Sequence, residues 1–279
     1  MKQKKSGAFS TILLILILLI GLSLMLYPSF SDWWNSMHQT RVIDTYMEQV
    51  SHIDPNQYSD IWSAAYSFNR ELQTKNQIFT LTPIMMEKYM KQLNVTGNGV
   101  MGFIQIPSIN VQLPIYHTVE DVVLQIAVGH IEWTSLPVGG EGTQCVLSGH
   151  RGLPSAKLFS DLDQLREGDT FLLHILDETL TYEVDQILIV LPEETQDLMI
   201  EEGKDLCTLI TCTPYGVNSH RLLVRGHRVE NAAMASNVRV TADALRVEPL
   251  AVAVILFFPI LLLILLLSSL LERKSNKNS

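Results

Sequence analysis

The chain has 279 residues, of which 47% are hydrophobic, and a formal net charge of −9. Six of its 20 Lys and Arg residues and one of its 29 Asp and Glu residues lie in the two terminal segments, so the part between them carries a net charge of −14. This acidic balance argues against a nucleic-acid partner, which requires a basic surface. The three cysteines show no Cys-x-x-Cys or Cys/His spacing typical of zinc, so we expect no metal and no other cofactor.

Two uncharged segments predict membrane-spanning helices at the two ends. Residues 6–31 follow three lysines, and residues 250–271 precede three basic residues. About 20 apolar residues span a bilayer, and flanking Lys and Arg stay on the cytoplasmic side. We therefore expect anchors within 1–31 and 250–279, both termini in the cytoplasm and residues 32–248 outside. A cleaved signal peptide is the alternative for the first segment, although no A-x-A site follows it.

The extracellular region 32–94 is predicted to be helical. The stretches HQTRVIDTYMEQV and NQYSDIWSAAYSFNRELQ carry apolar residues three and four positions apart, which indicates helices with one buried face. In LTPIMMEKYMKQLN, Thr82 is a plausible N-cap and Pro83 occupies the first turn. We expect these helices to pack on the domain that follows.

From residue 95 to residue 230 the chain shows short β-rich runs punctuated by Gly and Pro: GFIQI, QLPIY, TQCVLSG, DTFLLHIL, TLTYEVDQILIVL, DLCTLITC and RLLVRGHRV. Short helical stretches are expected near 119–127 and 155–165. Many short strands with few helices predict a mainly β domain that closes into a barrel. Residues 231–249 are predicted to link it to the second span.

The segment TLITCTPYGVNSHRLLVRGHR, residues 208–228, places a cysteine at the end of a predicted strand. Cys212 ends TLITC, TPYG breaks the strand, and Arg221 opens the next run, so the two can lie side by side across a sheet. A thiol needs a cationic or imidazole neighbour to ionise at neutral pH, and an imidazole can also protonate a leaving amine. The pattern indicates nucleophilic cysteine chemistry.

Among the eight histidines, His130 and His150 are the two candidates for that imidazole, and each follows a glycine. His150 in LSGHRG ends a β-run, as Cys212 does, so both can face the same rim, and we choose it. His130 in AVGHIEW is interpreted as structural or supporting. Spacing alone does not decide between them.

Other notable residues have structural interpretations. Cys145 and Cys207 are expected in the core, with a disulfide between them as the alternative. Arg151, which follows His150, is expected on a loop surface, with contact to a substrate as the alternative. Arg225 and Arg228 are expected in surface ion pairs.

TLITC resembles the TLxTC active-site motif of sortases, the membrane-anchored transpeptidases of Gram-positive bacteria. Together with VLSGHRG it resembles the pilin-polymerising branch, class C, over about residues 95–230. The resemblance implies a sortase-like closed β-barrel. It also implies that Cys212 is the nucleophile, His150 transfers protons, and Arg221 binds the substrate carbonyl and stabilises the oxyanion. Thr211 would assist the oxyanion through its backbone or its hydroxyl.

The implied activity is cleavage of an LPxTG-like sorting signal through a thioester on Cys212, followed by transfer of the acyl group to a lysine of another pilin subunit. The expected partners are pilins or surface proteins that carry such a signal, together with the membrane. One alternative is a housekeeping sortase that joins surface proteins to a cell-wall amine. Another is a catalytically silent membrane scaffold.

One feature departs from the class C pattern. Those sortases usually carry a lid with an Asp-Pro-aromatic motif before the barrel, whereas here Asp54-Pro55 is the only Asp-Pro and residues 71–94 contain none. We therefore expect a thiol that is open without a lid-opening step. The alternative is that this segment plugs the cleft through Phe79 or Met85.

Overall fold

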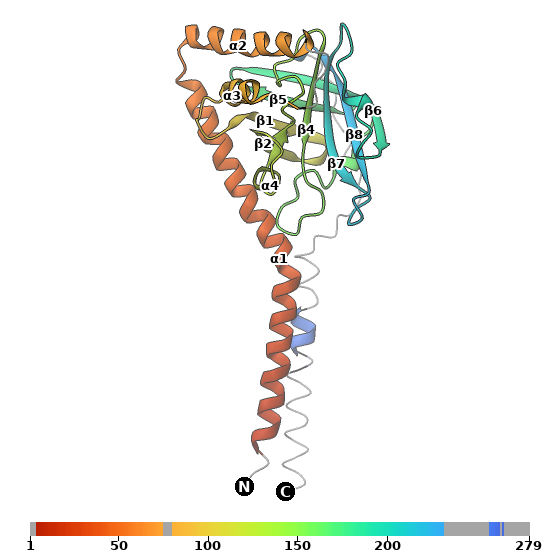
Figure 1. The fold of residues 1–279 in the computed structure, drawn as a ribbon. Helices are drawn as coiled ribbons and strands as arrows, with labels where there is room; N and C mark the ends of the chain where they lie inside the picture. Colours follow the sequence, from red (N-terminus) through yellow and green to blue (C-terminus); the bar gives the residue numbers. More distant parts are fainter. Residues whose placement is uncertain (1–3, 75–79, 232–256, 263, 265–279) are drawn as a thin grey trace. The chain divides into compact units, whose positions relative to one another are not determined.

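The computed structural model describes residues 4–74, 80–231, 257–262 and 264, and they are drawn as coloured ribbon in Figure 1. The chain divides into two compact units: Met1–Trp34 with Arg239–Ser279, and Asn35–Val238.

The first unit contains the N-terminal part of helix α1 (Lys4–Ser51). From Ile12 onward this helix is long and apolar enough to cross a membrane, with a mean hydropathy of 2.5 in its most apolar stretch, none of which is buried. It is the only such helix in the part of the chain that the structure describes. Residues 257–262 of the expected second span are helical, but most of 250–271 lies outside the described residues, so that span remains a prediction.

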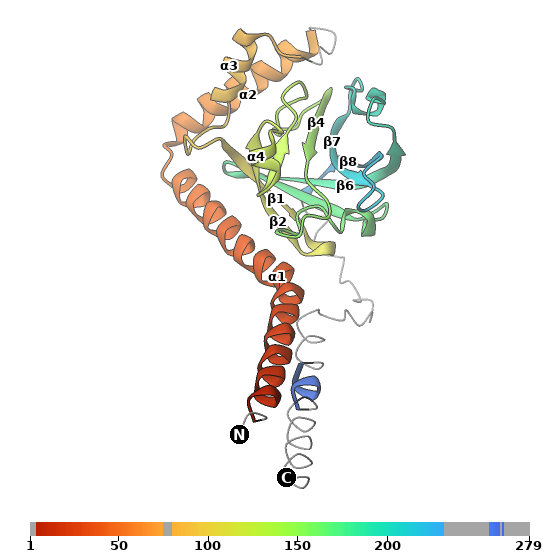
Figure 2. The same ribbon diagram turned by 60° about the horizontal axis from the view of Figure 1, so that its bottom comes forward.

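In the second unit, the rest of α1 is followed by α2 (Pro55–Thr74) and α3 (Pro83–Lys91). Each helix buries the apolar stripe that its sequence predicts, and α2 and α3 lie at one end of the barrel in both views (Figure 1; Figure 2). The predicted N-cap is confirmed, because the Thr82 side chain accepts a hydrogen bond from the Met85 amide, with Pro83 at the helix start. Tyr46 on α1 donates to the Met101 carbonyl at 3.0 Å, which joins the helix to the barrel.

The barrel has eight strands, as the described residues 100–229 show: β1 (Val100–Ile106), β2 (Val111–His117), β3 (Val128–His130), β4 (Thr143–Ser148), β5 (Thr170–Ile175), β6 (Glu178–Val190), β7 (Asp205–Thr213) and β8 (His220–Val229). They close in the order β1-β2-β3-β4-β7-β8-β6-β5, and β1 pairs with β5. The predicted mainly β, closed barrel is therefore confirmed. Most neighbours are antiparallel, but two pairs are parallel: β2 with β3, and β4 with β7, between which β5 and β6 intervene in the chain.

Two details differ from the sequence-based expectation. Strand β3 was not predicted, because its three residues contain a glycine and give no periodic signal. The helical stretch expected near 155–165 is reduced to a short 3-10 turn, η2 (Leu162–Gln164), whereas 119–127 contains the short helix α4 (Asp121–Leu124).

The barrel wall has two apolar faces, because successive side chains of a strand point to opposite sides. The interior face of β4, β7 and β8 carries Leu147, Leu209 and Val224, which belong to the main core. The outer face carries a second buried cluster, here named the outer-face cluster: Val146, Val190, Leu198, Ile210 and Leu223. Leu198 comes from the segment 191–204 between β6 and β7, so that segment packs over the outer face.

Candidate active site

The ends of two parallel strands bring the predicted histidine and cysteine to one rim. The register of β4 and β7 runs without a break from Thr143 opposite Asp205 to Ser148 opposite Ile210. It continues past the last ladder pair, because the Gly149 amide donates to the Ile210 carbonyl at 3.0 Å. His150 stands two residues beyond Ser148, and Cys212 stands two residues beyond Ile210. Extended by two residues, the same register aligns His150 with Cys212, although 61 residues separate them in the sequence.

The neighbouring strand supplies the predicted arginine. Strands β7 and β8 are antiparallel, and Cys212 is the direct cross-strand partner of Arg221. Directly opposed residues of an antiparallel pair share one face of the sheet. The expected adjacency of these two residues is thus observed, and Cys212 lies between His150 and Arg221 along the rim.

The Arg221 guanidinium is held from the loop between β7 and β8. Its Nη1 donates to the carbonyls of Asn218 at 3.3 Å and His220 at 3.1 Å. Both bonds use the same nitrogen, so Nε and Nη2 are the donors that a substrate oxygen could meet. A cation fixed by backbone carbonyls is well suited to stabilise negative charge that develops near the thiol.

The three cysteines, all of which lie in the described residues, differ in solvent exposure. Cys212 is partly exposed, whereas Cys145 and Cys207 are buried at 2% and 0% exposure, and all three thiols are free. The predicted core positions of Cys145 and Cys207 are confirmed, and no disulfide joins them in this structure. Only the thiol at the rim is reachable by a substrate.

Thr211 faces the other way from its neighbour Cys212. Its side chain is 2% exposed, and its hydroxyl donates to the Gly149 carbonyl at 2.8 Å. The hydroxyl is therefore engaged in holding the segment that carries His150, and it is not turned toward the rim. Thr211 was predicted to assist the oxyanion through its backbone amide or its hydroxyl, and this geometry is compatible only with the backbone amide. That role in binding the oxyanion remains a prediction.

The next rows of the same face are apolar. Ile210 pairs with Leu223, which in turn pairs with Leu188, and Arg221 pairs with Val190. Together with Leu198 these side chains line the outer face directly below the rim. An extended peptide whose reacting carbonyl lies at Cys212 would pass over this apolar surface.

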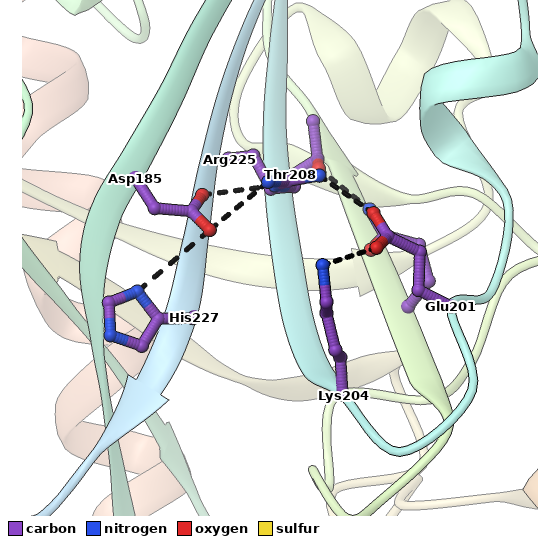
Figure 3. Close-up of polar contacts among 7 residues, drawn as sticks. Asp185, Glu201, Lys204, Thr208, Arg225 and His227 are labelled. Atoms are coloured by element: carbon purple, nitrogen blue, oxygen red, sulfur yellow. Dashed lines mark hydrogen bonds and ion pairs between the residues drawn. The ribbon is translucent and has the colours of Figure 1, made fainter.

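A polar network lies one row further along, and Figure 3 shows Asp185 and Glu201 reaching Arg225 from two sides. Arg225 donates from Nε to Asp185 of β6 at 3.0 Å and from Nη1 to Glu201 of the 191–204 segment at 2.8 Å. Lys204 pairs with the same Glu201, and His227 lies 3.9 Å from Asp185. The ion pairs expected for Arg225 are confirmed, and they fasten the 191–204 segment to the barrel.

Arg151 contradicts the expectation of a loop-surface side chain. It is only 10% exposed, pairs with Asp163 and donates from Nη1 to the Thr213 hydroxyl at 3.2 Å. No local sequence pattern indicates this position, because the partners lie 12 and 62 residues away. Arg228 lies over the Tyr182 ring, with 5.8 Å from its Cζ to the ring centroid, where an ion pair was expected.

The described residues do not show a lid at the thiol. Asp54 accepts a hydrogen bond from the Asn56 amide at the start of α2, so Asp54-Pro55 begins a helix. Met85 is buried and lines an apolar cavity of about 160 Å³ that also borders Gln144. Gln144 stands six residues before His150, about 20 Å along β4 at about 3.3 Å per residue. Met85 is therefore not a plug at the rim, and Phe79 lies outside the described residues.

Within the described residues, no group of three or more His, Cys, Asp or Glu side chains is arranged to hold a metal ion. The chemistry that the rim itself offers is that of a thiol, an imidazole and a guanidinium. A thiol that acts as nucleophile beside a proton-transferring imidazole is the arrangement that cysteine acyl transfer requires.

Comparison with known proteins gives the class. A family model described as a Sortase domain matches residues 104–229. The crystal structure of sortase C1 from Streptococcus agalactiae is 51% identical, covers 68% of this chain and 99% of its own, and superposes with a TM-score of 0.67. The chain therefore belongs to the sortase family, whose members are cysteine transpeptidases.

The structural neighbours are class C sortases. The sortase C structure from Streptococcus pneumoniae is 42% identical, with 68% and 97% of the two chains covered and a TM-score of 0.62. Clostridium perfringens sortase C, solved with a C-terminal cell wall sorting motif, is also 42% identical, with 68% and 99% covered and a TM-score of 0.61. Among curated relatives, sortase D of Bacillus subtilis is 32% identical over 46% of this chain. The match covers 63% of that relative, which is less than two thirds of its length.

Proposed function

We propose that the protein is a membrane-anchored cysteine transpeptidase that cleaves an LPxTG-like sorting signal and transfers the acyl group to a lysine of a pilin subunit. The observation that carries this proposal is the placement of Cys212 between Arg221, its cross-strand partner, and His150, at the end of the adjacent parallel strand. The three groups come from three strands and share one rim. The pilin step is supported by the class C neighbours, one of which is described in terms of pilin substrate specificity.

The proposed first half-reaction forms a thioester. The Cys212 sulfur attacks the carbonyl carbon of the signal's threonine, and Arg221 stabilises the oxyanion together with the Thr211 backbone amide. The C–N bond to the following glycine then breaks, and the leaving amine takes a proton from the His150 imidazolium. The product is an acyl-enzyme with the substrate's threonine carbonyl bound to Sγ.

The second half-reaction transfers the acyl group. A lysine ε-amine attacks the thioester carbonyl, gives its proton to His150 and forms an isopeptide bond. The Cys212 thiolate leaves, and the enzyme returns to its starting state. Both substrates would be held in the same membrane as the enzyme, which raises their effective concentration.

The domain organisation and topology belong to the same proposal. Residues 1–31 and 250–279 would anchor the chain, residues 32–94 and 95–230 would form the extracellular helical region and catalytic barrel, and 231–249 would link the barrel to the second span. The basic residues beside each apolar segment place both termini in the cytoplasm. Protease added to intact protoplasts should then degrade the segment between the spans and spare both tails. Digestion of the C-terminal tail would contradict a second span.

The activity is tested with the full chain in detergent. It is incubated with a sorting-signal peptide and two competing acceptors, a lysine-bearing pilin domain and a cell-wall-type amine, and the products are identified by mass spectrometry. A thioester on Cys212 and a lysine isopeptide are expected. Exclusive use of the cell-wall amine would instead support the housekeeping alternative. Absence of any acyl-enzyme would contradict the transpeptidase and favour a silent scaffold.

A further inference from the structure

The residues on both sides of His150 are tied to the residues on both sides of Cys212. Before the histidine, Gly149 accepts a hydrogen bond from the Thr211 hydroxyl at 2.8 Å. After it, Arg151 donates from Nη1 to the Thr213 hydroxyl at 3.2 Å. Thr211 and Thr213 are the two neighbours of Cys212, and both are buried. The two hydrogen bonds therefore bracket the pair whose separation matters for proton transfer.

The second bond depends on a guanidinium that is held away from solvent. The Arg151 side chain is 10% exposed, and its Nη2 pairs with Asp163 at the 3-10 turn η2. Its Nε is buried and has no hydrogen-bond partner among the described residues. Removing a charge and a donor from water costs free energy unless their interactions offset it. A loop arginine with only a surface role would not be placed in this way.

The shape of the side chain suits this bridging role. A guanidinium is a planar fork whose nitrogens can bond two groups at once, whereas an ammonium is a point charge. Here Nη1 bonds Thr213 at the end of β7, and Nη2 bonds Asp163, which follows Arg151 by 12 residues in the sequence. The His150 carbonyl also accepts from the Phe159 amide at 3.1 Å, so the segment after β4 folds back on itself. The arginine fixes this folded segment to the strand that carries the nucleophile.

We infer that Arg151 is a positioning residue that sets the His150 imidazole against the Cys212 thiol through Thr213 and Asp163. The inference rests on the proposed function, since it assigns a role to His150 in that reaction. The hydrogen bonds of the Arg151 guanidinium go to Thr213 and Asp163, so its role is to act through these neighbours. A displacement of about 1 Å between catalytic groups can cost about a hundredfold in rate, so its removal should affect the chemical step rather than substrate binding.

The experiment uses the full chain in detergent, with kcat and KM for a sorting-signal peptide expressed per folded enzyme. Arg151→Ala should lower kcat about tenfold to a hundredfold, with KM little changed. Arg151→Lys should remain impaired, because it keeps the charge but loses the fork. Lys157→Ala is the matched control, since it removes the Lys157–Asp161 ion pair from the same segment and leaves the Arg151 contacts in place. An unchanged kcat in Arg151→Ala, or an equal loss in Lys157→Ala, would overturn the inference.

A double-mutant cycle separates positioning from general stability. Thr213→Val removes the hydroxyl with little change in volume. If Arg151 acts through Thr213, the double variant should be no slower than Arg151→Ala alone, because the interaction is lost only once. Effects that multiply would show that the two residues act independently, and this would also overturn the inference.

A third measurement distinguishes failure of the inference from failure of the proposed function. The alkylation rate of Cys212 is compared in the wild type, His150→Ala and Arg151→Ala. The two variants should shift the rate in the same direction. If only His150→Ala changes the rate, the positioning role is wrong and the proposed site stands. If His150→Ala has no effect, His150 is not coupled to the thiol and both fail.

Discussion

The barrel holds two groups of residues that each contain a cysteine and a histidine preceded by a glycine, and the two groups differ in exposure. At the rim, Cys212 is partly exposed and lies beside His150 and Arg221. In the interior, Cys145 pairs directly with Cys207 across β4 and β7, and His130 on β3 is 0% exposed. The residue types are nearly the same, so the chemistry is decided by which face of the strand each side chain occupies.

The interior site uses its polar groups for structure. His130 donates from Nε2 to the Ser135 carbonyl at 2.8 Å, so its Nδ1 is the acceptor for the Tyr89 hydroxyl at 3.0 Å. Tyr89 in turn accepts from the Thr118 amide at 3.1 Å, which fastens α3 to the barrel. Burial raises the pKa of Cys207 well above its ordinary value, and the adjacent Cys145 thiol raises it further. Nothing in this site is turned toward a substrate.

Removing the thiol from each region should give the largest contrast. Cys212→Ala should abolish turnover, because no other group can carry the acyl intermediate. Cys207→Ala should keep kcat and lower the free energy of unfolding by about 1 kcal/mol, the cost of a small buried void. Turnover and urea unfolding measure the two effects. In the native wild type, a thiol reagent should modify Cys212 alone, and equal labelling of all three thiols would contradict the division into rim and interior.

The two histidines should also separate activity from stability. His150→Ala should lower kcat/KM by a factor of about 10² to 10⁴, the usual contribution of a positioned general acid and base. His130→Ala should leave substantial activity in the folded fraction but destabilise the domain by about 1–3 kcal/mol, because the Tyr89 hydroxyl loses a buried partner. Steady-state kinetics and thermal unfolding are measured on both variants. The reverse pattern would mean that the catalytic imidazole is His130.

Two arginines four residues apart on β8 allow a finer comparison. Arg221→Lys should lower kcat by a factor of about 10² to 10³, because a point charge does not reproduce the planar fork at the developing oxyanion. Arg225→Lys should leave kcat nearly unchanged and cost about 1 kcal/mol of stability, since it weakens partly exposed pairs to Asp185 and Glu201. Equal losses of kcat in the two variants would contradict the assignment of the oxyanion contact to Arg221 at the rim.

The smallest expected effect is the dependence of stability on pH. Burial lowers the pKa of His117, although its two ring nitrogens lie 2.9 Å from the carbonyls of Gly99 and Gln92. Burial also lowers the pKa of His174. These histidines are therefore protonated at a higher pH in the unfolded chain than in the folded protein. The free energy of unfolding decreases as the pH falls below about 6.5, and above that pH these two groups do not change it.

This pH effect is checked by thermal unfolding from pH 7.5 to pH 5. His117→Gln should lose less of its Tm on acidification than the wild type does. His52→Gln, which changes an exposed histidine just after α1, serves as the control and should follow the wild-type curve. A wild-type Tm that rises on acidification through this range would contradict the sign of the argument.

Much of the local structure follows from the sequence alone. The alternation of apolar residues predicted seven of the eight strands, Thr82 and Pro83 marked the start of α3, and TLITC pointed to a thiol at a strand end. These features arise from contacts between residues close in sequence, where backbone propensity and side-chain periodicity are decisive. The resemblance carried by TLITC and VLSGHRG then pointed to the sortase family.

The tertiary structure decided which strand ends meet. Nothing in the sequence pattern shows that β4 and β7 are parallel neighbours, that β3 lies between β2 and β4, or that Arg151 turns inward to Thr213. Strand order and register depend on pairing between residues about 60 positions apart, and they are selected by burial of the whole barrel rather than by local propensity. His150 and Cys212 can each be identified as candidates from their own segments, but only closure of the barrel sets them side by side.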